Sequence, residues 1–138
     1  MNKLSPANTS YLLEVGMEDL HQQSNTWLSE IEFWRLELSF YQKLLDKVTV
    51  RIPAGEDKKA IDHFQNLLLY YQGELLDRYE HDTRAHEKLL GSMVEEKAPF
   101  NEQLYREDHK RHESQLQTFA TGFKQYRKEL YAFAEKYI

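Results

Sequence analysis

The residues best suited to chemistry are histidines and acids in two short charged segments. Residues 105–114 read YREDHKRHES, in which His109 and His112 are three apart, so a helix places both on one face. The segment EDLH gives Glu18 and His21 the same spacing. Imidazoles and carboxylates that converge from several helices hold iron, manganese or zinc in helical bundles. We therefore treat these residues as candidate metal ligands.

Each segment matches part of a known kind of metal site. Glu18 and His21 resemble the Glu-x-x-His element of ferritin-like di-iron proteins, but the chain has no second such element. His109 and Glu113 resemble one fragment of a hemerythrin-like site, whose His-x-x-x-His partner is missing. A metal site therefore depends on whether the fold brings these partial motifs together.

Three long helices are predicted to carry these residues. Pro6, Pro53 and Pro99 divide the chain into three similar pieces, and Asp57 and Asn101 could cap the second and third helices. Core residues alternate at spacings of three and four in all three pieces, and no piece has the period-two pattern of a strand. In the second piece this alternation selects Ile61, Phe64, Leu68, Tyr71, Leu75, Arg78, Asp82, Ala85 and Leu89.

We therefore expect an all-α fold, an antiparallel bundle of three long helices in which residues 1–138 form a single helical-bundle domain. The alternative is a bundle of four helices with a break near residues 22–26, where Ser24, Asn25 or Thr26 could cap a new helix. The alternation runs through Ser24 without interruption, which favours one continuous first helix.

Antiparallel folding is predicted to gather the polar residues. Folding about residues 52 and 98 places His21 near residues 83 and 114, so one half of the bundle is rich in histidine and the other in aromatic residues. In the polar half, Ser24, Arg78, Asp82, His109 and His112 take core positions. The metal hypothesis uses His21, His86, His109 and His112 as leading ligands, supported by Glu18, Asp82 and Glu113. The competing interpretation is a polar network without metal.

Composition restricts the classes of function. The formal net charge of -5 disfavours nucleic acid and anionic membranes as partners, and the absence of cysteine excludes disulfides and thiolate ligands. The longest apolar run, LLLYY, is too short to cross a bilayer, and MNKLSPANTS lacks the apolar segment of a signal peptide. We expect a soluble cytoplasmic protein. The chain has no glycine-rich phosphate loop or nucleophile elbow, so nothing indicates an enzyme.

Two stretches, NTWLSEIEFWRLELSFYQKLLDK and HFQNLLLYYQGELLDRYEHDTRAHE, followed by FKQYRKELYAFAEKY, resemble a group of short, uncharacterised all-helical bacterial proteins. The resemblance implies an all-helical cytoplasmic domain without an assigned activity, and no functional residue follows from it.

The sequence thus favours a small structural or protein-interaction module, which could form a homodimer through an uncovered apolar stripe. The alternatives are a metal-binding bundle with iron, manganese or zinc, and a histidine-based pH-responsive element.

Overall fold

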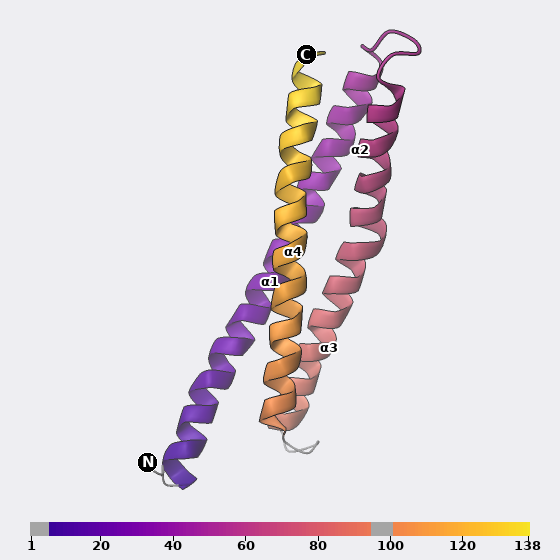
Figure 1. Ribbon diagram of the computed structural model, residues 1–138. Helices are drawn as coiled ribbons and strands as arrows, with labels where there is room; N and C mark the ends of the chain where they lie inside the picture. Colours follow the sequence, from indigo (N-terminus) through magenta and orange to yellow (C-terminus); the bar gives the residue numbers. More distant parts are fainter. Residues whose placement is uncertain (1–5, 95–100) are drawn as a thin grey trace.

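The protein is a bundle of long helices. The computed structural model describes residues 6–94 and 101–138, with side chains described for 16–92 and 101–138. The helices are α1 (Pro6–Thr49), α2 (Lys58–Tyr70), a π-helical turn η1 (Tyr71–Leu75), α3 (Leu76–Val94) and α4 (Glu102–Glu135). Because α2, η1 and α3 follow one another without a gap, they form one long rod, and three rods make the bundle (Figure 1). The described residues contain no strand, which confirms the all-α prediction.

The first helix is continuous, so the four-helix alternative with a break near residues 22–26 is wrong. The Thr26 hydroxyl donates to the Gln22 carbonyl oxygen at 3.1 Å, a bond made inside a helix and not at a helix start. Ser24 and Trp27 are both buried, so the core face passes through this segment without a change of phase.

The two expected helix caps have different outcomes. Asn101 caps α4 as predicted, because its Oδ1 accepts from the Leu104 amide at 3.0 Å. Asp57 stands at the N-cap of α2 but makes no side-chain cap bond. Its carboxylate instead accepts a hydrogen bond from the Tyr137 hydroxyl, which ties the start of α2 to the C-terminal end of the chain.

The π-helical turn changes which face of α3 is buried. A π turn contains one residue more than an α turn, so everything after it is rotated by about 100°. The predicted core positions Arg78, Ala85 and Leu89 are accordingly exposed, and Leu75 and Asp82 are only half-buried. The buried residues lie one position later, at Leu76, Thr83, His86 and Leu90.

The core consists of two apolar clusters with a polar layer between them. The larger cluster is aromatic-rich and includes Trp34, Tyr41, Phe119, Phe123 and Tyr126. The smaller one contains Met17, Leu90 and Tyr105. Between them along the helices, five polar residues are buried: Ser24, Thr83, His86, His109 and His112. The expected polar half of the bundle is therefore an internal layer closed by apolar side chains on both sides.

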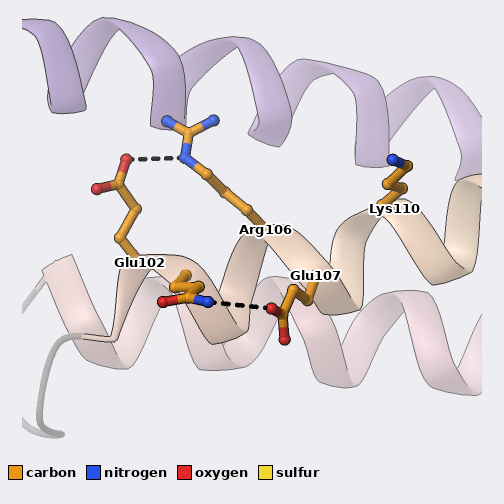
Figure 2. A pocket seen from close by; sticks show the side chains of 5 residues that line it. Glu102, Arg106, Glu107 and Lys110 are labelled. Carbon is orange, nitrogen blue, oxygen red and sulfur yellow. Dashed lines mark hydrogen bonds and ion pairs between the residues drawn. The ribbon is translucent and has the colours of Figure 1, made fainter.

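Near the start of α4, Arg106 joins α4 to α1. Its Nε donates to Glu102 Oε1 at 2.7 Å, and Figure 2 shows the guanidinium reaching toward α1. The guanidinium lies over Gly16, where a Cβ would be only 2.6 Å from one of its nitrogens. The absence of a side chain at Gly16 therefore allows this contact. The groove beside it is lined by polar and charged side chains of α4, of which Gln103 donates to Glu107.

Candidate metal centre

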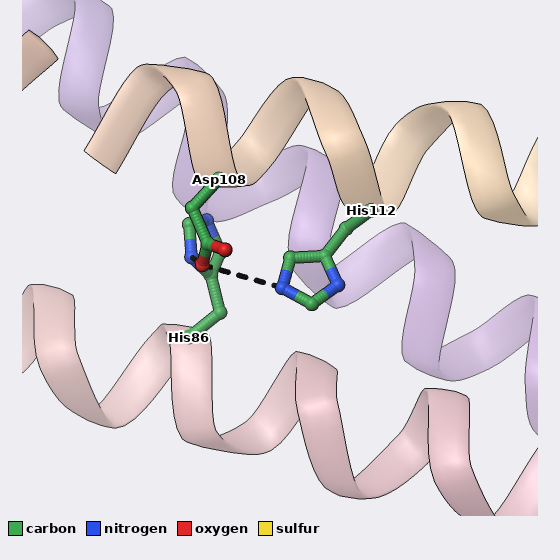
Figure 3. A group of neighbouring side chains, drawn as sticks. All are labelled: His86, Asp108 and His112. Carbon is green, nitrogen blue, oxygen red and sulfur yellow. Dashed lines mark hydrogen bonds and ion pairs between the residues drawn. The ribbon is translucent and has the colours of Figure 1, made fainter. Parts of the chain in front are cut away.

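Three side chains from two helices offer ligand atoms that lie close together. The rotation at η1 turns His86 of α3 into the bundle, and α4 contributes Asp108 and His112, which are four residues apart and share a face. One ligand atom from each residue lies within 4.8 Å of the other two. Figure 3 shows the three side chains converging between the two helices. We call this group the His86 cluster.

Asp108 is the centre of the His86 cluster. Its Oδ2 lies 2.9 Å from His86 Nδ1 and 3.3 Å from His112 Nε2. Its other oxygen, Oδ1, accepts from the Arg111 guanidinium. The His86 side chain is fully buried, whereas the Asp108 side chain is 26 % exposed. The carboxylate therefore stands between a buried imidazole and the protein surface.

A second set of contacts fixes the orientation of His86. Its Nε2 lies 3.0 Å from His109 Nδ1, and His109 Nε2 lies 2.8 Å from Gln23 Oε1. The His86 ring stacks on Tyr105 with centroids 4.2 Å apart and an interplanar angle of 9°. The His109 ring packs against Trp27 at 4.4 Å. Both imidazoles are thus held by packing as well as by hydrogen bonds.

Burial sets the charge of these groups. It lowers the pKa of His109 to about 4, and the nearby imidazoles of His86 and His112 act in the same direction. Burial also lowers the pKa of His86, although Asp108 opposes this effect. For Asp108, burial would raise the pKa, but His112, His86 and Arg111 together hold it below its usual value. At neutral pH the cluster thus contains an ionised Asp108 beside an uncharged His86.

The proton between His86 and Asp108 depends on which end of the Gln23 amide faces His109: with Nε2 there, His86 donates from Nδ1 to Asp108, and with Oε1 there, as in this structure, no proton lies between them. Because Gln23 Oε1 can only accept, the one proton of uncharged His109 is on Nε2, and its Nδ1 accepts. His86 therefore carries its own proton on Nε2, where it donates to His109. His86 Nδ1 then points a lone pair at Asp108 Oδ2 from 2.9 Å. Two acceptors at this distance repel each other unless a cation lies between them.

A surface groove gives access to the His86 cluster. The groove has a volume of about 390 Å³ and is lined by His86, Asp108 and His112 together with neighbouring side chains. These neighbours are Asp82, Ala85, Leu89, Arg111 and Gln115. An ion from solution can therefore reach the cluster without unfolding of the bundle.

The other predicted ligands lie outside the His86 cluster. His21 pairs with Glu87 and is about half exposed, and Glu18 is exposed. Asp82 is half-buried and lines the groove, and Glu113 lines a different groove beside Trp27. His109 contacts His86 from the side away from Asp108.

Sequence reasoning did not include Asp108 and Gln23 among the site residues. Asp108 has a local signal, since it precedes His112 by four residues on the same helix face. Gln23 has none, because its role depends on a contact between α1 and α4 that only the fold creates.

Comparisons with protein-family models, with curated proteins and with solved structures find no match to this chain. The resemblance to short all-helical bacterial proteins therefore stays a prediction. Among residues 6–94 and 101–138, no helix is both long and apolar enough to cross a membrane.

Proposed function

We propose that the protein binds one divalent transition-metal ion through His86 Nδ1, a carboxylate oxygen of Asp108 and His112 Nε2. The observation that carries this proposal is the convergence of three ligand atoms, with Asp108 Oδ2 at 2.9 Å from His86 Nδ1 and 3.3 Å from His112 Nε2. In the tautomer that the Gln23 amide orientation favours, His86 Nδ1 carries no proton. A metal ion between this nitrogen and Asp108 Oδ2 replaces their repulsion with two favourable bonds.

The donor set indicates the class of metal. Two imidazole nitrogens and one carboxylate oxygen suit zinc, ferrous iron and similar first-row ions, whereas calcium and magnesium prefer oxygen ligands. Three protein ligands leave at least one coordination position for water or a small ligand. That position would face the groove that the three ligands line.

The neighbouring hydrogen bonds support the same proposal. A metal-bound histidine usually donates its second ring N–H to a fixed acceptor, which sets the tautomer and the ring orientation. His86 has such an acceptor in His109 Nδ1, and His109 in turn donates to Gln23. His86 is therefore oriented for binding through Nδ1 before any ion arrives.

Calorimetric titration of the metal-free protein with Zn²⁺ tests the proposal. We expect one equivalent to bind to the wild-type protein and no measurable binding after His112→Ala. The matched control is His81→Ala, because His81 is an exposed histidine of α3 outside the His86 cluster. This variant should bind Zn²⁺ like the wild type. Helical circular dichroism of each variant shows whether the bundle is intact.

Two results would overturn the proposal. One is a folded wild-type protein that binds no Zn²⁺, Co²⁺ or Fe²⁺. In that case the Gln23 amide is rotated by half a turn, so its nitrogen donates to His109 Nε2 and His109 donates from Nδ1 to His86 Nε2. His86 then donates from Nδ1 to Asp108, and the layer is a polar network without metal. The other is equal loss of binding in the His81 and His112 variants, which would mean that zinc binds nonspecifically to surface histidines.

A further inference from the structure

The outer face of α1 carries an apolar stripe. Phe33, Leu36 and Phe40 are 60 %, 65 % and 57 % exposed, and they lie within two turns of one another along α1. The opposite face of the same helix segment is buried in the core through Trp34, Leu38 and Tyr41. This segment therefore has two apolar faces, of which the bundle covers one.

The charges beside the stripe have opposite signs at its two ends. Glu32 lies at one end and Lys43 at the other, and both side chains are exposed. They are eleven residues apart, which is three turns of helix to within about 20°, so both lie along the same edge of the stripe.

We propose that α1 pairs with α1 of a second copy of this chain, antiparallel, through Phe33, Leu36 and Phe40. In an antiparallel pair of helices, side chains on the same edge of each helix meet. When Phe33 lies level with Phe40 of the second copy, Glu32 of each copy lies near Lys43 of the other, with an axial offset of about 3 Å. The two-fold symmetry forms this ion pair twice.

The apolar residues fit the same alignment. When Phe33 lies level with Phe40 of the second copy, the two Leu36 side chains meet near the two-fold axis. A two-fold interface requires a patch that is complementary to itself, and the placement of Glu32 and Lys43 makes this face so in charge. In a parallel pair, opposite edges of the two helices meet, so Glu32 and Lys43 of one copy would not face those of the other.

Sedimentation equilibrium of the wild-type protein and its variants tests this proposal. Because the stripe is short, we expect micromolar affinity, and concentrations up to about 200 µM are needed. The mass should approach twice the monomer value of 16.6 kDa. Leu36→Glu should weaken dimerisation at least about tenfold. The matched control is Leu69→Glu on α2, which changes another exposed leucine outside the stripe.

Charge reversal tests the antiparallel alignment. Glu32→Lys and Lys43→Glu should each weaken the dimer, because each creates two like-charge contacts. The double variant should restore wild-type affinity within about threefold. A wild-type protein that stays monomeric would overturn the dimer, and a double variant no tighter than the single variants would overturn the alignment. Neither result bears on the metal site, which is formed by α3 and α4.

Discussion

His86 Nε2 lies 3.0 Å from His109 Nδ1, on the side of the imidazole away from Asp108. A residue outside the proposed ligand set thus determines which nitrogen of His86 faces the metal position. Gln23 of α1 determines in turn which nitrogen of His109 carries the proton. In this way all three rods of the bundle contribute to a site whose ligands come from only two of them.

We predict that Gln23→Leu weakens Zn²⁺ binding by about ten- to a hundredfold without unfolding the protein. The reason is that His109 loses the acceptor that fixes its tautomer, so His86 is no longer held with a free Nδ1. Gln23→Glu is the matched control, because it keeps an acceptor oxygen at this position. Calorimetric titration measures both affinities. Equal affinity in the wild type and the leucine variant would show that Gln23 does not position the site.

We predict that deletion of Gly73 preserves the fold. The π turn at Tyr71–Leu75 contains one residue more than an α turn, so the deletion gives a continuous α-helix. Phe64 and Leu68 before the turn, and Leu76 and His86 after it, then keep their alignment with the core. Thermal or urea unfolding should show a free energy of unfolding within about 1 kcal/mol of the wild type.

Deletion of Lys124 is the control for the Gly73 experiment. Lys124 is also exposed, but it lies within a regular part of α4, where a deletion rotates Tyr126 and Leu130 out of the core. We expect a loss of more than about 3 kcal/mol or an unfolded protein. If the two deletions destabilise the protein equally, the extra residue is not located at η1.

Stability of the metal-free protein should fall as the pH is lowered. The pKa of His109 is about 4 in the folded protein against 6.5 for an ordinary histidine, so the unfolded chain binds more protons between these values. The free energy of unfolding should therefore be nearly constant above about pH 7 and fall by about 2 kcal/mol by pH 5. The lowered pKa of His86 adds to the loss. Urea titrations in the presence of a chelator measure this dependence.

His109→Gln provides the control for the pH experiment, because it removes one of the two titrating groups and should make the pH dependence shallower. Stability that is unchanged or higher at pH 5 in the wild type would contradict the burial of a neutral His109.

The sequence predicts the buried faces of α1 and α4 correctly, because the alternation of three and four residues continues there without a break. In α4 every selected position from Tyr105 to Phe133 is buried. The predicted buried face of α3 was wrong, because one additional residue in the π turn rotates all the residues that follow. The signal was present, since Arg78 and Asp82 fell on expected core positions while Leu76, Tyr79 and Leu90 stood one residue later.

The proposed site could be predicted only in part, for the same physical reason. His109 and His112 follow from the regular period of α4, and His86 was proposed from its expected level in the bundle. Which face of α3 carries His86 depends on η1. Asp108 differs from Asp82 and Glu113 in lying about 3 Å from the imidazoles of His86 and His112. The sequence predicts the alignment of neighbouring helices only to within several residues, which is too coarse to distinguish these three acids.

The most direct test of the metal proposal is elemental analysis of untagged protein purified after growth with iron, manganese and zinc. We predict close to one equivalent of a single transition metal in the wild type, and none after combined His86→Ala and His112→Ala substitution in a protein that remains helical. Wild-type protein without metal that also fails to bind added metal, or metal retained by the double variant, would contradict the proposed site.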